Sequence, residues 1–412
     1  MPVTHLLRGK TVLYRFTLQT TFLALLTVTL AACQQPPVKP EPPPPPIPPV
    51  ATVYHRDATA AVDFLAQSLA QQLARTARPT QATVPVEEFF STQSAEVSAS
   101  GRALQQRLAT ALSATFAPLK FVPLDTTSAN NAQWVVLANH ATPNPSENLQ
   151  AGTWVRLQVA MVESSTGKVL TRISTYLDAA QFNSEPTQFF KDAPMYFTDE
   201  RHRQRIGVMG GQAQTQALGS ALQIQSELSD AIAAYEAGRF PDAEQGFIKV
   251  KALAPNHPGA LTGLYQTYWK QGRRTEAEQA FSDLVGAGVD AGSLSVKLLF
   301  KVGGTAFVDS ADLATQYRLW LKSVGQVASS KDRCVDVTGH AGKSGSAELN
   351  DRLSQQRAES IVALIAQTSR DARTRFKPSG RGFQETIVGT GANDATDAID
   401  RRVEFKVRTC TQ

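Results

Sequence analysis

Residues 335–357 read VDVTGHAGKSGSAELNDRLSQQR and decide the fold of the C-terminal part of the chain. A β-rich run comes first and ends in a turn dotted with glycine at 339–345. A helical pattern follows, and it is expected to begin near Ser346, because Glu348 then lies in the first turn. A strand, a turn and a helix in this order predict part of an α/β domain.

The expected helix carries an ordered set spaced as N-x-x-L-S-x-x-R-A: Asn350, Leu353, Ser354, Arg357 and Ala358. About fifty residues later the chain reads D-R-R-V at 400–403, directly before an expected last strand. This combination resembles the peptidoglycan-associating OmpA-like domain. That family has a Gly-His turn, the same helix motif, and N-R-R-V before its final strand. The resemblance covers residues 294–410.

We therefore assign residues 292–412 to an OmpA-like domain, for which the resemblance implies a βαβαββ fold. Strands are expected at 296–301, at 334–338, around Phe383 and at 403–408. The helix at 347–366 is expected to bury Leu349 together with the other apolar residues of its pattern.

The resemblance also implies a ligand, the diaminopimelate end of a peptidoglycan stem peptide, which presents a carboxylate beside an ammonium group. The family's cation corresponds to Arg357, whose planar guanidinium suits a carboxylate. The family's anion is an Asp, but that position is Gly342 here. Together with Asn350 and His340, these residues form the predicted peptidoglycan site.

Several alternatives stay open at this site. The missing carboxylate has three candidate replacements, and Asp400 departs from the family Asn. An ion pair with Asp351, Glu359 or Glu385 is the alternative role for Arg357. We expect Asn350 to cap or brace the turn rather than contact ligand, and His340 to hold the turn by hydrogen bonding. The candidate replacements are Glu348, Asp351 and Asp309.

Cys334 begins the second expected strand of this domain and Cys410 ends the last. The family's sheet implies that these two strands are antiparallel neighbours, which brings the cysteines side by side. Because the periplasm is oxidising, we expect a disulfide between them.

The N-terminus predicts export. Residues 1–32 have a basic start and an apolar run at 22–32 that is too short to span a bilayer. The run ends Leu-Ala-Ala-Cys, which resembles a bacterial lipobox with Cys33 as the acylated residue, carrying palmitate-type chains. Gln34 follows, which in that sorting pattern favours the outer membrane.

A proline-rich tether occupies residues 33–57. Ten of the fourteen residues from 36 to 49 are Pro, so the segment is expected to be stiff polyproline II reaching roughly 40 Å. We interpret it as a spacer, and a ligand for a proline-binding domain is the alternative.

The middle of the chain divides into three segments. Helical and alternating patterns at 58–180 predict an α/β domain with loose similarity to periplasmic domains of the CsgG/FlgO kind. Residues 181–221 lack periodicity and are expected to be an irregular connector whose aromatic residues pack back on the α/β domain. Residues 222–291 contain a repeat of 34 positions, seen in Gly238 and Gly272 and in Phe247 and Phe281, which resembles tetratricopeptide helix pairs. The resemblance implies binding of an envelope protein, and a purely structural spacer is the alternative.

Composition and motifs exclude several classes of function. Beyond residue 32 there are 38 basic and 36 acidic side chains, which gives no argument for nucleic acid. No catalytic motif, metal-ligand spacing or cofactor signature is present, so no enzyme, metal or cofactor is predicted.

The sequence predicts a multidomain α/β and α protein that faces the periplasm as an outer-membrane lipoprotein and binds peptidoglycan. The main alternative is a scaffold or assembly factor of an envelope complex whose OmpA-like domain no longer binds peptidoglycan. An enzyme acting on cell-wall glycan is disfavoured, because no pair of acids lies in a catalytic motif.

Overall fold

The computed structural model describes residues 53–76, 82–117, 119–143, 149, 153–210, 218–301, 303–386 and 400–410. The chain divides into two units, Met1–Pro49 and Val50–Gln412, and every described residue belongs to the second. The predicted export signal, Cys33 and the proline-rich tether up to residue 52 lie outside the described residues. No helix within the described ranges is long and apolar enough to cross a membrane.

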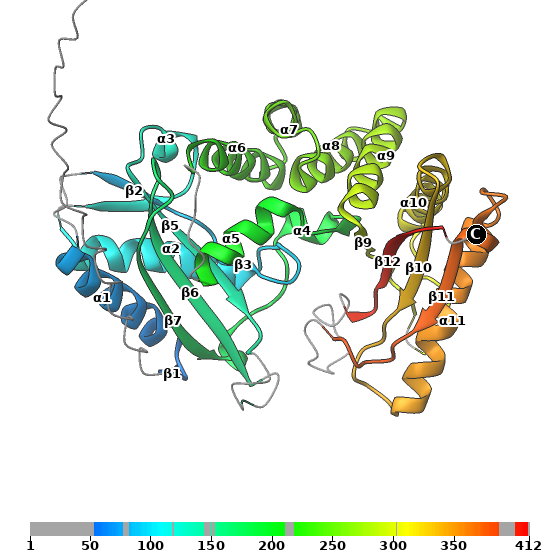
Figure 1. Cartoon of the computed structure of the whole chain (residues 1–412), viewed down its shortest axis with the longest axis horizontal. Helices are drawn as coiled ribbons and strands as arrows, with labels where there is room; N and C mark the ends of the chain where they lie inside the picture. Colours follow the sequence, from blue (N-terminus) through cyan, green and yellow to red (C-terminus); the bar gives the residue numbers. More distant parts are fainter. Residues whose placement is uncertain are drawn as a thin grey trace, which may run out of the picture. The chain divides into compact units, whose positions relative to one another are not determined.

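A seven-stranded sheet organises the first part of the described chain (Figure 1). Its order is β1-β7-β6-β5-β2-β4, with β3 paired to β5. The strands β2, β4 and β5 are parallel, whereas β5, β6 and β7 are successively antiparallel. The strands are β1 (Tyr54–His55), β2 (Thr83–Val86), β3 (Phe90–Ser91), β4 (Lys120–Pro123), β5 (Trp134–Ala141), β6 (Trp154–Glu163) and β7 (Val169–Asp178). The helices are α1 (Ala58–Thr76), α2 (Ala99–Thr115), α3 (Thr126–Ala129) and the short 3-10 helix η2 (Ala179–Gln181).

Both faces of this sheet are covered, because successive side chains of a strand point to opposite faces. On β5, Val136 and Ala138 belong to the core formed with α1 and α2. Val135 and Leu137 belong to a second cluster, to which α5 (Glu200–Gly210) contributes Val208 and Met209. The central strand is accordingly apolar on both sides.

The stretch at 181–221 is not wholly irregular, which corrects the expectation. It contains α4 (Gln188–Asp192), β8 (Met195–Tyr196), α5 and the start of the next helix. Phe189, Met195 and Phe197 do not pack on the α/β core; they join the core of the helices and the C-terminal sheet. The reason is tertiary, since β8 pairs with a strand of that sheet.

Four helices follow as two antiparallel pairs: α6 (Gly219–Glu236), α7 (Phe240–Leu253), α8 (Pro258–Lys270) and α9 (Arg274–Ala291). Positions 34 apart have the same environment, since Phe247 and Phe281 are both fully buried. Gly238 and Gly272 end equivalent helices with φ of 73° and 76°, a conformation that favours glycine. The repeat is therefore structural, and its tetratricopeptide character stays a prediction.

The last part of the chain forms a five-stranded sheet with the order β11-β10-β12-β9-β8. β10 and β11 are parallel, whereas β12 is antiparallel to β10 and β9. The elements are β9 (Ser293–Val296), α10 (Ala311–Ser330), β10 (Arg333–Gly339), α11 (Ala347–Ile365), α12 (Ala372–Arg375), β11 (Phe376–Gly380) and β12 (Val403–Thr409).

Three details of this region differ from the sequence-based expectation. The first strand ends at Val296 rather than beginning there, and the third strand is β11, whereas Phe383 lies in a turn. Leu349 is 46% exposed, because it lies in the first turn of α11, where residues 346–349 are all exposed.

One hydrophobic core extends from helices α6–α9 into the C-terminal sheet. Phe281 of α9 stacks on Trp320 of α10, with ring centroids 5.8 Å apart. The Trp320 indole N–H donates to the Tyr265 hydroxyl at 2.7 Å, and that hydroxyl donates to Gln316 at 2.7 Å. The repeat and the C-terminal domain are thus packed against each other without a linker.

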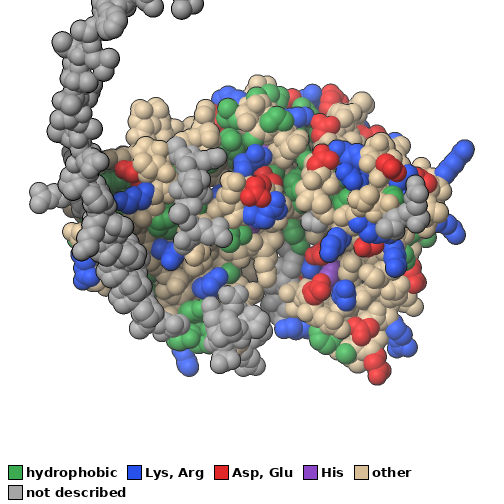
Figure 2. All heavy atoms as spheres, viewed as in Figure 1, with side chains coloured by type: hydrophobic (Ala, Val, Ile, Leu, Met, Phe, Trp, Pro, Cys, Tyr) green, Lys and Arg blue, Asp and Glu red, His purple; other side chains and the backbone are tan. Residues whose placement is uncertain are grey.

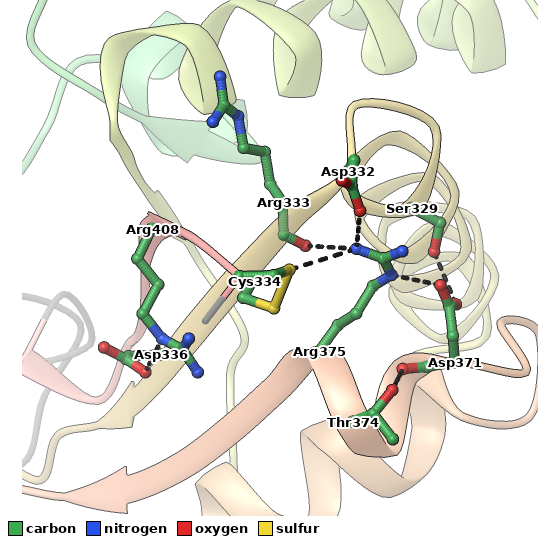
Figure 3. Close-up of a disulfide and its surroundings, with 10 residues drawn as sticks. Ser329, Asp332, Arg333, Cys334, Asp336, Asp371, Thr374, Arg375 and Arg408 are labelled. Atoms are coloured by element: carbon green, nitrogen blue, oxygen red, sulfur yellow. Dashed lines mark hydrogen bonds and ion pairs between the residues drawn. A yellow bond between two sulfur atoms is a disulfide. The ribbon is translucent and has the colours of Figure 1, made fainter. Parts of the chain in front are cut away.

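Cys334 and Cys410 are joined by a disulfide with a Cα–Cα distance of 4.9 Å (Figure 3). Cys334 lies opposite Arg408 in the antiparallel β10–β12 ladder. Cys410 follows Arg408 by two residues and therefore lies on the same face, so it is the diagonal neighbour of Cys334. Arg375 lies beside the disulfide and donates to the Sγ of Cys410 at 3.4 Å. The same side chain is ion-paired with Asp371 at the start of α12.

Candidate functional site in the C-terminal domain

The helix motif predicted from the sequence lies on α11 and packs tightly against the sheet. Ser346 caps this helix, its hydroxyl accepting from the Leu349 amide at 3.2 Å. A Cβ at Gly339 would lie 2.2 Å from the Ser354 carbonyl oxygen, and one at Gly380 would lie 2.5 Å from the Gln355 nitrogen. Only glycine permits this approach, so β10 and β11 hold the middle of α11, and with it Arg357, against the sheet.

Arg357 is buried, with 1% of its surface exposed. Its Nε donates to the Gly304 carbonyl at 3.1 Å and its Nη2 to the Lys301 carbonyl at 3.3 Å. The guanidinium carbon lies 4.8 Å from the ring centroid of Phe300. Burial, together with the nearby cation Arg401, lowers the pKa of Arg357 to about 10, so it remains charged at neutral pH.

No carboxylate within the described ranges forms an ion pair with Arg357. None of the alternative partners Asp351, Glu359 and Glu385 pairs with it; Glu359, for example, accepts from Gln355 at 2.8 Å. A buried cation that is held only by neutral carbonyls and a ring is costly unless an anion compensates it. Arg357 therefore defines a position suited to an anionic group.

The turn at 339–345 carries the other predicted residues. The side-chain amide of Asn350 donates to the Ser344 carbonyl at 2.9 Å, so Asn350 braces the turn, as the interpretation we favoured expects. Gly342 is buried, yet no described atom lies within 4 Å of where its Cβ would be. The turn therefore has room for a side chain at the position where the family has Asp.

The missing carboxylate would pair with the ligand ammonium, and its candidate replacements have the following surroundings in this structure. Asp309 is 86% exposed on its side chain and pairs with the Lys301 ammonium at 2.8 Å. Asp351 lies beside Gly382, whose Cβ would clash with its Oδ1. Glu348 is exposed at the start of α11. Asp400 is fully buried and has a partner of its own.

His340 does not hold the turn by a side-chain hydrogen bond, which corrects the expectation. Its backbone amide donates to the Arg402 carbonyl at 3.0 Å, whereas both ring nitrogens lack a hydrogen-bond partner in the described part of the chain. The ring lies between two carboxylates, with Nδ1 4.0 Å from Glu385 and Nε2 3.6 Å from Glu404. Burial opposes ionisation of Glu404, but His340 and Arg402 outweigh it and hold its pKa at about 2.

Sequence reasoning missed several residues of this region. The carbonyls of Lys301 and Gly304 hold Arg357, but a backbone acceptor leaves no residue-specific signal. Glu404 and Arg402 were detectable in principle, because alternation along the last strand places 402 and 404 on the same face.

Residues 308–399 match the OmpA family. The chain therefore contains an OmpA family domain in its C-terminal part, which includes the turn at 339–345 and Arg357. The match covers less than a quarter of the chain, so it identifies the class of this domain and not the whole protein.

Three solved structures are similar to part of the chain, each with a TM-score of 0.23 or 0.24. A peptidoglycan-associated lipoprotein from Burkholderia pseudomallei is 22% identical over 27% of this chain and 88% of its own, with a TM-score of 0.23. The cell wall anchor of the T6SS from Pseudomonas aeruginosa is 28% identical over 29% of this chain and 81% of its own, with a TM-score of 0.24. The periplasmic domain of Helicobacter pylori MotB is 14% identical over 29% of this chain and 76% of its own, also with a TM-score of 0.24. No curated protein sequence matches the chain. The similarity to CsgG/FlgO-type domains stays a prediction.

Acidic and basic side chains are interspersed over the face seen in Figure 2, with no extended patch of one sign. This distribution agrees with the balanced charge of the sequence and offers no electrostatic footprint for a nucleic acid on that face.

Proposed function

We propose that this protein is an outer-membrane lipoprotein that attaches to peptidoglycan without a covalent bond, through its OmpA family domain. The observation that carries the proposal is Arg357, a buried cation on the N-x-x-L-S-x-x-R-A helix with no carboxylate partner in the described ranges. A stem-peptide carboxylate, such as that of diaminopimelate, would supply the compensating charge.

Ligand binding would exchange weak acceptors for a strong one. Arg357 now donates single hydrogen bonds to two neutral carbonyls, at 3.1 and 3.3 Å. A carboxylate accepts two parallel hydrogen bonds from the guanidinium fork, and such charge-assisted bonds are roughly twice as strong as neutral ones. The ligand ammonium would lack the family Asp, because position 342 is glycine, so we expect weak binding.

Co-sedimentation with purified diaminopimelate-type peptidoglycan tests the proposal. The wild type should pellet with the polymer, and Arg357→Lys should remain largely in solution, because Lys keeps the charge but lacks the planar fork. Arg352→Lys is a matched control, since Arg352 is an exposed residue on the same helix. Thermal unfolding of each variant shows whether the fold is retained, because Arg357 is buried.

A wild-type protein that does not pellet, or an Arg357→Lys variant that is folded and pellets equally well, would contradict the proposal. In either case the role of Arg357 would be internal to the domain.

The second candidate is a scaffold of an envelope complex in which the OmpA family domain no longer binds peptidoglycan. Gly342 favours it, and so does the core that the helices α6–α9 share with the domain, because it makes the repeat a rigid extension. This candidate predicts that the wild type stays in solution with peptidoglycan and that an envelope protein is retained by the helical repeat.

The lipid anchor is a separate part of the proposal. Acylation of Cys33 and the proline-rich spacer would hold the described domains on the periplasmic side of the outer membrane. Cys33→Ser should release the protein from the membrane fraction into the soluble fraction, while an unchanged distribution would argue against the lipobox. Several acyl chains at Cys33 suffice for stable attachment, at about 0.8 kcal/mol per buried CH₂.

A further inference from the structure

His340, Glu385 and Glu404 bring three metal-binding side chains together from three segments of the C-terminal domain. One ligand atom from each residue lies within 4.8 Å of the other two. His340 directly follows β10, Glu385 ends the turn after β11, and Glu404 lies on β12. Together they offer one imidazole nitrogen and two carboxylate oxygens.

The imidazole is the decisive group. His340 is 1% exposed, and neither ring nitrogen has a hydrogen-bond partner within the described residues. A buried polar group without a partner is costly, and native structures usually satisfy it with water, an ion or another side chain. Both nitrogens of His340 face carboxylates, at 3.6 and 4.0 Å, which is beyond hydrogen-bond distance.

Arg402 positions both carboxylate-bearing segments. Its Nε donates to Glu404 Oε1 at 2.7 Å, and its Nη2 donates to the Glu385 carbonyl at 3.1 Å. The bond to Oε1 leaves the other oxygen of Glu404, Oε2, directed at His340. Carboxylates that bind metals are commonly oriented by such hydrogen bonds from a neighbouring residue.

Charge and access also suit a divalent cation. Glu385 and Glu404 place two carboxylates beside the His340 ring, and a divalent cation bound between them would offset that negative charge; the cations Arg402 and Lys406 line the same cavity. Glu385 and Glu404 line a cavity of about 630 Å³ that also includes Tyr196 and Ser295, so an ion can reach these two carboxylates from solvent.

We infer that His340, Glu385 and Glu404 form a binding site for a first-row divalent metal ion, for which zinc is the suitable probe. Imidazole and carboxylate ligands suit Zn²⁺, with bond lengths of roughly 2.0–2.2 Å. Tetrahedral ligands at those lengths lie about 3.4 Å apart, so ligand atoms that now lie within 4.8 Å of one another would close by up to about 1.4 Å on binding. Glu385 and Glu404 are partly exposed and can make that adjustment. A bound ion would link the ends of β10 and β11 to β12.

Calorimetric titration of the untagged, chelator-treated full chain with Zn²⁺ tests the inference, and Co²⁺ absorption reports the coordination geometry. We expect one ion per chain. Glu385→Gln, at a half-exposed turn position that should not affect folding, is expected to weaken binding about tenfold or more. His340→Gln should do the same, and Zn²⁺ should raise the melting temperature of the wild type only.

His257→Gln is the matched control. His257 also has a buried ring nitrogen without a partner in the described chain, but it belongs to no cluster with two carboxylates there. It should bind Zn²⁺ like the wild type. The inference is overturned if the wild type binds no stoichiometric ion at micromolar Zn²⁺, or if Glu385→Gln binds as tightly as the wild type. Neither outcome depends on peptidoglycan binding.

Discussion

Replacing Gly342 with aspartate should strengthen attachment to peptidoglycan. The change restores the carboxylate that the OmpA-like family has at this position, opposite the ligand ammonium. Gly342 does not have a positive φ, and no atom of another described part of the chain lies within 4 Å of its ideal Cβ position. An aspartate at this turn is therefore compatible with the backbone and with the space around it.

The magnitude follows from one added charge-assisted contact. Hydrogen bonds to charged groups contribute about 1.5–3 kcal/mol, which corresponds to roughly ten- to hundred-fold in affinity. The position is buried, so part of that gain is offset by desolvation of the new carboxylate. We expect an increase near the lower end, about tenfold.

Co-sedimentation at increasing peptidoglycan concentration measures the change, with Gly342→Asn as the matched control. Asparagine has nearly the same size and no charge, so it should bind like the wild type. Equal affinity of Gly342→Asp and Gly342→Asn would refute the reasoning, because size rather than charge would then matter. If the wild type fails to bind and Gly342→Asp binds, the role of the missing carboxylate is correct and the proposed function of the wild type is wrong.

Three further predictions concern stability. The disulfide closes a loop of 76 residues. On the chain-entropy estimate, Cys334→Ser should therefore lower the free energy of unfolding by about 4 kcal/mol, measured by denaturant unfolding. An unchanged unfolding curve would show that the disulfide does not form. The Arg375 hydrogen bond, with help from Ser329, lowers the pKa of Asp371 to about 2 from 3.8. This carboxylate therefore stabilises the fold above about pH 4, and its contribution is lost as the pH falls towards 2. After discounting for its exposure, the contribution is about 1 kcal/mol. Asp371→Asn should flatten the plot of unfolding free energy against pH in this range. Gly272→Ala should lower the free energy of unfolding by about 1 kcal/mol in thermal or denaturant unfolding, because φ at this position is 76°. Gly286→Ala, within the α9 helix, is the control and should not destabilise the protein. Equal effects of the two substitutions would contradict the backbone argument.

The elements that the sequence predicts best have local causes. Gly238 and Gly272 recur 34 positions apart, and both adopt the left-handed conformation that only glycine takes easily. The N-x-x-L-S-x-x-R-A helix is predicted with its start at Ser346, because a capping hydroxyl and the apolar spacing lie within one short segment.

The features that escaped prediction have distant causes. β8 consists of two residues, and it is a strand only because β9 pairs with it. Leu349 fits the apolar pattern of α11 but lies in the exposed first turn of the helix. The partners of Arg357 are backbone carbonyls of a loop more than fifty positions away, and the orphan nitrogens of His340 depend on how three segments meet.

The strand β8 has a mechanical consequence. It precedes the helical repeat in sequence but forms the edge of the C-terminal sheet. The repeat therefore lies, in sequence, between two strands that are neighbours in one sheet, β8 and β9. A pulling force between a wall-bound C-terminal domain and the preceding α/β domain would therefore act on two sets of contacts at once. These are the β8–β9 hydrogen bonds and the hydrophobic core around Phe281 and Trp320. Pulling the protein apart at this junction would require a sheet edge and a hydrophobic core to yield together, so we expect it to resist extension as one unit.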